Sequence, residues 1–193
     1  MHPKAQSARW SVIALTLALS AGGCVSEEAR IRQEVMRRVA IMDTPHSKMA
    51  LQIADLGPAA IPYVDEALWD PYLGPAVKAD LVNVLHMIRD RRSIPALAKV
   101  ADSRPIDEVT DPMVRLPMIS PAGLSLNAQR AIVMILGVKE QENFGTFDVP
   151  FPDLDPAESA ARRREYCTNL NKWYKQWRTT YDPSQYASAA AKK

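Results

Sequence analysis

Apolar side chains between residues 51 and 101 recur at every third or fourth position, which is the spacing of a helix with one buried face. Within this stretch the phrase Ala60-Ile61-Pro62 returns as Ser93-Ile94-Pro95, and the two Ile-Pro pairs lie 94 − 61 = 33 residues apart. A repeated unit of this length is typical of stacked helix pairs, each too small to bury its own apolar face. The pattern therefore predicts an all-α fold built from short repeats.

Cap and turn residues divide the chain into a series of expected helices. Ser26 is a favourable N-cap, Thr44-Pro45 is a typical helix start, and Gly57-Pro58 and Gly74-Pro75 separate apolar stripes. The expected helices cover residues 26–42, 45–56, 59–69, 75–88, 93–102, 124–138 and 155–181.

The segment 77–97 resembles a HEAT repeat in the short form of bacterial HEAT-like proteins. The resemblance rests on Val77-Lys78, Leu81-Val82, Val84-Leu85, Ile88, Asp90 and Ser93-Ile94-Pro95-Ala96-Leu97. Leu56-Gly57 with Ala60-Ile61-Pro62 resembles the preceding repeat, and 124–138 resembles the first helix of a third. His86 and Arg89 stand where such repeats usually carry glycine. Over residues 44–138 the resemblance implies a short α-solenoid of helix pairs, and we expect a long C-terminal helix to cap it.

A proline-rich segment, 103–124, interrupts the repeats. Its prolines forbid a continuous helix, and long connections in compact domains are often functional. It either packs over the end of the stack or binds a partner. In the second case the candidate partner-binding residues are Met113, Val114, Leu116, Met118 and Ile119.

Aromatic and basic residues distinguish the C-terminal part, in which we expect a loop over 139–155, a helix to Tyr181 and a disordered tail at 182–193. Trp173 and Trp177 lie on an apolar stripe of this helix together with Tyr166, Leu170 and Tyr181. The stripe either caps the last repeat or forms an aromatic-basic surface for glycans or lipid headgroups. Trp173 and Trp177 are therefore further candidate partner-binding residues.

The first 23 residues have the pattern of a signal peptide. Lys4 and Arg9 precede a short apolar run, and Ala21-Gly22-Gly23-Cys24 resembles the lipobox of bacterial lipoproteins. The resemblance implies that Cys24 is lipidated and begins a mature N-terminal segment, 24–43, that carries the first helix. Without Lys4 and Arg9, 24 − 2 = 22 basic residues stand against 22 acidic ones. A chain so near neutrality gives no indication of nucleic-acid binding.

The sequence contains no pattern typical of a catalytic, metal or cofactor site. His46 and His86 lack metal-ligand spacing, and Cys167 is expected to pack as a small apolar side chain. Together these features predict a non-enzymatic, membrane-anchored scaffold that faces the periplasm and binds an unidentified envelope protein. The cell membrane and the outer membrane both remain open as its location, and Val25 and Ser26 favour the outer membrane. Two alternatives also remain: an accessory ligand-binding or enzyme subunit that uses a cleft beside 103–124, and cell-wall glycan binding by the aromatic helix.

Overall fold

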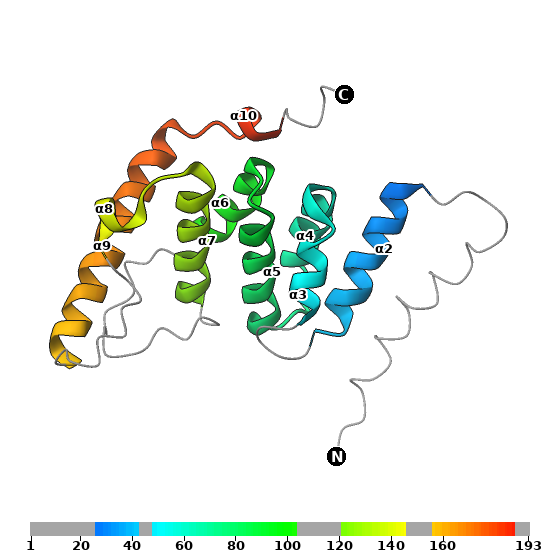
Figure 1. Ribbon diagram of the computed structural model, residues 1–193, viewed down its shortest axis with the longest axis horizontal. Coiled ribbons are helices and arrows are strands. Elements are labelled where there is room, and N and C mark those ends of the chain that lie inside the picture. Colours follow the sequence, from blue (N-terminus) through cyan, green and yellow to red (C-terminus); the bar gives the residue numbers. More distant parts are fainter. Residues whose placement is uncertain (1–25, 43–47, 104–120, 146–155, 188–193) are drawn as a thin grey trace, which may run out of the picture.

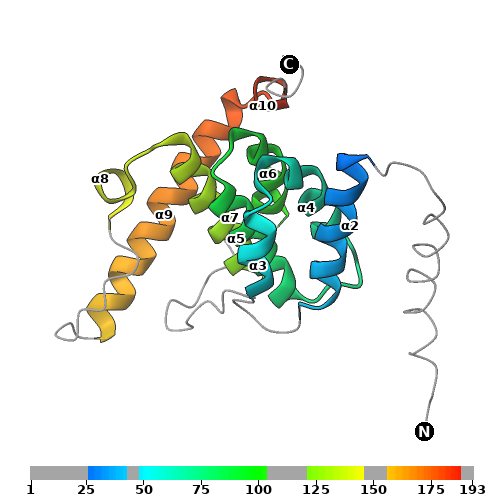
Figure 2. The same cartoon turned by 45° about the vertical axis from the view of Figure 1, so that its right-hand side comes forward.

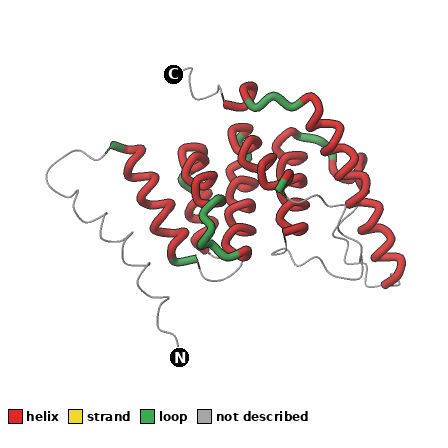
Figure 3. The backbone as a smooth tube through the Cα atoms, turned by 180° about the vertical axis from the view of Figure 1, so that it is seen from behind, coloured by secondary structure: helices red, strands yellow, loops and turns green. Residues whose placement is uncertain are grey.

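The computed structural model describes residues 26–42, 48–103, 121–145 and 156–187, and these ranges contain helices and no strand (Figure 3). The predicted all-α class is confirmed. The α-helices are α2 (Glu27–Ala40), α3 (Lys48–Ala54), α4 (Ile61–Leu68), α5 (Pro75–Ile88), α6 (Ile94–Asp102), α7 (Pro121–Leu136), α8 (Glu140–Phe144), α9 (Pro156–Thr180) and α10 (Ser184–Ala187). Two short 3₁₀ turns are η1 (Gly57–Ala60) and η2 (Arg91–Ser93).

Several predicted helix boundaries agree with the structure because the local signals are strong. Ser26 caps α2, since its side-chain oxygen accepts a hydrogen bond from the backbone N–H of Ala29 at 3.2 Å. Helix α5 begins at Pro75 and ends at Ile88, as the apolar stripe predicts. Asp90 accepts a hydrogen bond from the backbone N–H of Arg92 at 2.8 Å, so the polar corner before α6 is itself capped.

The helices around Gly57 are shorter than the apolar pattern predicts. Gly57 has a φ of +68°, which ends the preceding helical segment, and the 3₁₀ turn η1 follows it. As a result α4 begins at Ile61 and not near residue 59. The described part of the preceding helix is Lys48–Ala54, and the predicted start at Thr44-Pro45 lies outside the described residues.

Helices α2 to α7 stand beside one another in a row, and α9 lies across the end of the row that is farthest from α2 (Figures 1 and 2). Helix α5 contacts both α3 and α7, while α2 contacts α3 and α4. Helices two apart in the chain, α3 with α5 and α5 with α7, therefore lie side by side in the row. The assignment of the stack to a HEAT-like solenoid stays a prediction.

A stack of helix pairs implies that residues 93–102 pack mainly against 75–88, but this is not the dominant packing of α6. Helix α6 makes its most extensive contacts with α7, which follows it in the chain. Small side chains account for this preference, because helices approach most closely where the contact residues are small. Both helices contribute buried alanines to the same core, namely Ala98, Ala101, Ala128 and Ala131.

One apolar core runs through the row of helices. The side chains of Val35 in α2, Ile53 in α3, Val64 in α4, Leu85 in α5 and Ile132 in α7 are all 0% exposed. Each lies on an apolar stripe of its helix, so the helical periodicity of the sequence is used directly in packing. A second, smaller core lies under α9 and contains Leu126, Val133, Phe144, Tyr166 and Leu170.

The predicted loop over 139–155 is wrong for its first part, because residues 140–144 form α8. Phe144 explains the helix, since it is 3% exposed and its ring packs edge-on against Tyr166 and Trp173 at centroid distances of 6.3 and 5.9 Å. Burial of this ring holds the short helix against α9. Residues 146–155 lie outside the described part.

The predicted disordered tail is also wrong for residues 184–187, which form α10. Asp182 accepts a hydrogen bond from the backbone N–H of Ser184 at 2.9 Å, and the ring of Tyr186 stacks on Tyr181 at a centroid distance of 5.6 Å. A cap and an aromatic contact therefore hold this turn in place. Residues 188–193 lie outside the described part.

Candidate binding surfaces

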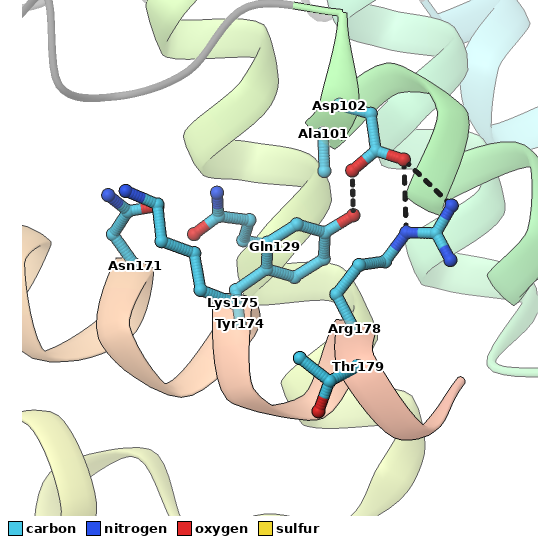
Figure 4. A pocket seen from close by; sticks show the side chains of 8 residues that line it. All are labelled: Ala101, Asp102, Gln129, Asn171, Tyr174, Lys175, Arg178 and Thr179. Atoms are coloured by element: carbon cyan, nitrogen blue, oxygen red, sulfur yellow. Dashed lines mark hydrogen bonds and ion pairs between the residues drawn. The ribbon is translucent and has the colours of Figure 1, made fainter.

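Helix α9 is fastened to α6 by a hydrogen-bonded cluster of three side chains. The hydroxyl of Tyr174 donates to Asp102 Oδ1 at 2.8 Å and also lies 3.2 Å from the carbonyl oxygen of Ala98. Arg178 Nε donates to Asp102 Oδ2 at 3.0 Å (Figure 4). Burial and the nearby Asp102 carboxylate both raise the pKa of Tyr174, so its hydroxyl remains a proton donor.

A pocket opens beside this cluster, where α6, α7 and α9 meet. Its volume is about 350 Å³, and its lining residues are Ala101, Asp102, Gln129, Asn171, Tyr174, Lys175, Arg178 and Thr179 (Figure 4). Ala101 and Asp102 come directly before the predicted insertion at 103–124. Polar side chains from all three helices converge in this pocket, and the cleft that the sequence analysis expected beside residues 103–124 stays a prediction.

Gln129 is the most unusual residue of this pocket. Its side chain comes from α7 and reaches the space between Asn171 and Tyr174 (Figure 4), yet the residue is only 1% exposed. Its Oε1 is buried and accepts no hydrogen bond from any residue in the described ranges. Buried side-chain oxygens usually have a partner, so this atom requires an explanation.

A second cluster of similar composition fastens α9 to α7 and α8. The Tyr166 hydroxyl donates to Glu140 Oε1, and Arg130 Nε donates to the same oxygen at 2.9 Å. The Arg130 guanidinium also lies 5.9 Å from the centre of the Tyr166 ring. Tyr166 and Tyr174 lie about two turns apart on one side of α9. In both clusters a tyrosine hydroxyl and an arginine donate to the same carboxylate, Glu140 in one and Asp102 in the other.

The predicted surface residues Trp173 and Trp177 are half-buried and pack against the main core. Their rings stack at a centroid distance of 6.0 Å, and Trp177 continues to Tyr181 at 4.7 Å. The packing of both rings against the main core helps to hold α9 on the row. These contacts favour the capping interpretation of the aromatic stripe, and partner binding by the two tryptophans stays a prediction.

The remaining sequence-predicted site residues cannot be placed. Cys24 lies outside the described residues, and so do Met113, Val114, Leu116, Met118 and Ile119. Their assigned roles in lipidation and partner binding stay predictions. No helix in the described ranges is long and apolar enough to cross a membrane.

The turn between α4 and α5 carries two exposed aromatic side chains that the sequence analysis missed. Tyr72 is 91% exposed and Trp69 is 46% exposed. Trp69 Nε1 donates to Asp65 Oδ1 at 2.9 Å, and the backbone N–H of Tyr72 donates to Asp70 Oδ1 at 2.8 Å. The available signal was the position of both rings outside the apolar stripes of α4 and α5, in a turn where polar residues are usual.

The histidine and cysteine of the described part are packed side chains. Burial lowers the pKa of His86, and the charges of Arg89 and Arg130 lower it further. Burial raises the pKa of the Cys167 thiol, so the nucleophilic thiolate is disfavoured. No group of three or more His, Cys, Asp or Glu residues in the described ranges is arranged to hold a metal ion.

Comparisons with known proteins add no relative to this description. No protein-family model matches the sequence, no curated protein matches it, and no solved structure matches the fold.

Proposed function

We propose that this protein is a protein-binding module of the bacterial envelope, anchored by a lipid on Cys24 and facing the periplasm. The observation that carries the proposal is the pair of exposed aromatics, Trp69 and Tyr72, on the α4–α5 turn. Large aromatic side chains dominate the binding energy of many protein interfaces, and Trp and Tyr are enriched at their centres. The partner is another envelope protein that presents an apolar surface.

The turn is ordered before any partner arrives, which favours binding. Asp65 holds the indole of Trp69 and also pairs with Lys99 of α6 at 3.3 Å. Asp70 closes the backbone turn that carries Tyr72. Because these contacts restrict the turn, less conformational entropy is lost on association. The segment containing Met113 to Ile119 is proposed as a further part of the partner interface.

Site-specific photo-crosslinking in intact cells tests the binding surface. A benzophenone amino acid replaces Tyr72 in the full chain, and a control carries it at Lys172, which is exposed on α9. We expect a discrete adduct with one envelope protein from position 72 only, and a weaker adduct when Trp69→Ala is added. No adduct at position 72, or the same adducts from both positions, would contradict the proposed surface.

Replacement of Cys24 tests the anchor. We expect the unaltered protein to sediment with membranes and to yield an acylated peptide that begins at Cys24. Cys24→Ala should leave the protein in the soluble fraction, because acyl chains contribute about 0.8 kcal/mol per buried CH₂ and supply the membrane affinity. Mass spectrometry of the N-terminal peptide identifies the modification, and an unmodified Cys24 in the membrane-bound protein would exclude this anchor.

The ligand-binding alternative is favoured by a separate observation, the pocket between α6, α7 and α9. Its lining contains neither Trp69 nor Tyr72. Binding at the pocket and binding at the α4–α5 turn can therefore be tested independently.

A further inference from the structure

The folded chain leaves one polar atom unpartnered in the pocket between α6, α7 and α9. Gln129 is 1% exposed, and none of the described residues donates a hydrogen bond to its Oε1. A buried acceptor without a donor destabilises a protein by about 1–3 kcal/mol. A methionine or leucine at this position of α7 would avoid that cost, so the amide has no evident structural benefit.

The other polar groups around the pocket already have partners. Tyr174 and Arg178 both bind Asp102. Asn171 and Lys175 are also engaged in interactions of their own. Among the lining side chains that the structure describes, Gln129 Oε1 is thus the buried acceptor without a donor, and the lining also contains apolar groups such as the methyl of Ala101 and the ring of Tyr174.

We propose that this pocket binds an extended peptide segment, one backbone N–H of which donates a hydrogen bond to Gln129 Oε1. A peptide residue has one backbone N–H donor next to its side chain, which can be apolar. This combination matches the unpartnered Gln129 Oε1 together with the apolar groups of Ala101 and Tyr174 in the pocket wall. A sugar carries several hydroxyl groups, each of which requires a polar partner after burial, and most polar side chains of this pocket are already engaged in other interactions. A volume of about 350 Å³ accommodates one or two residues and is near the lower end of small-ligand pockets.

Nuclear magnetic resonance titration of the full-length protein tests this proposal with capped single residues as probes. The first probe, N-acetyl-leucine methylamide, has two amide N–H donors. The second is the same molecule with both amide nitrogens methylated, which removes the donors and keeps the apolar side chain. We expect saturable shifts of the Gln129 side-chain amide and of the backbone amides of Ala101 and Tyr174 with the first probe, at a dissociation constant of about 1 mM.

The methylated probe should bind about tenfold more weakly, because it cannot donate to Gln129. Gln129→Met should weaken the first probe by a similar factor while the midpoint of thermal unfolding stays equal or rises. A second variant, Thr179→Trp, changes an exposed lining residue of α9 and should close the pocket without altering the core. This variant decides the question if Gln129→Met fails to fold.

Three outcomes would overturn the proposal. The first is the absence of saturable shifts near Gln129, and the second is equal affinity for the two probes. The third is tighter binding of N-acetylglucosamine than of the peptide probe, which would assign the pocket to a glycan. None of these outcomes affects the Trp69–Tyr72 surface, because the two sites share no lining residue.

Discussion

At the scale of single residues, two left-handed backbone positions end the long helices α5 and α7. Gly137 has a φ of +74°, its N–H donates to the carbonyl of Met134, and the N–H of Val138 donates to the carbonyl of Val133. This is the Schellman arrangement, and glycine adopts it without steric cost. Arg89 ends α5 with a φ of +53° although it carries a Cβ. The left-handed helix end is therefore strained at Arg89 and unstrained at Gly137.

Replacing Arg89 with glycine should stabilise the protein. The left-handed conformation costs an ordinary residue about 1–2 kcal/mol, while glycine adds an entropic cost of about 0.5–1 kcal/mol in the unfolded chain. We expect a net gain of about 0.5–1 kcal/mol and a rise of about 1–4 °C in the midpoint of thermal unfolding. Differential scanning calorimetry measures this change. Gly137→Ala is the matched control and should lower the midpoint, and a lower midpoint for Arg89→Gly would contradict the strain argument.

At the scale of elements, α9 is attached by hydrogen-bonded clusters as well as by apolar contacts. The helix contributes Tyr166 to a cluster with Glu140 and Arg130, and Tyr174 to a cluster with Asp102. The apolar stripe of α9 decides which side of the helix faces the row. Hydrogen bonds add precision because their geometry is directional, and the two clusters therefore refine the rotation of α9 about its axis.

Removing the Tyr174 hydroxyl should loosen α9 without unfolding the row of helices. A hydrogen bond to a charged acceptor contributes about 1.5–3 kcal/mol. Because the Asp102 side chain is 40% exposed, water partly replaces the lost donor. We expect Tyr174→Phe to lower the free energy of unfolding by about 1 kcal/mol and to increase hydrogen exchange in α9.

Urea denaturation and hydrogen-exchange mass spectrometry measure the two effects of Tyr174→Phe. Tyr72→Phe removes the same hydroxyl from a side chain that is 91% exposed. This control should change the stability by less than about 0.5 kcal/mol. If both variants behave alike, the Asp102 cluster does not hold α9.

At the scale of the whole molecule, a single core joins α2 to α7, so the row of helices is expected to unfold as a unit. Leu85 of α5 lies at its centre, is 0% exposed, and belongs to a helix that contacts α3, α4 and α7. When one core side chain packs against several helices, the stability of each helix depends on that side chain. Local damage at such a position therefore spreads along the row.

Leu85→Asp should unfold the whole row of helices. An unpaired buried carboxylate, together with the lost apolar contacts, costs about 4 kcal/mol or more, which is a large part of the stability of a typical domain. Met87→Asp is the control, because Met87 lies on the same helix and is 38% exposed. Circular dichroism should show loss of helix for Leu85→Asp and retention for Met87→Asp. A folded Leu85→Asp protein would show that the core is not continuous through α5.

The sequence alone determined the helical class and most helix boundaries, because these depend on local signals. The apolar spacing in α5, the cap at Ser26 and the long stripe of α9 each act within a few turns of one chain segment. Long-range burial decided the rest. Helix α8 is held in place because the ring of Phe144 packs against the rings of Tyr166 and Trp173. The small alanine side chains of α6 and α7 allow these two helices to pack closely. The pocket at Gln129 is formed by residues of α6, α7 and α9, which lie far apart in the sequence. A local sequence pattern therefore could not predict it. The exposure of Trp69 and Tyr72 was likewise decided by packing, since burial belongs to the folded chain and not to the residue type.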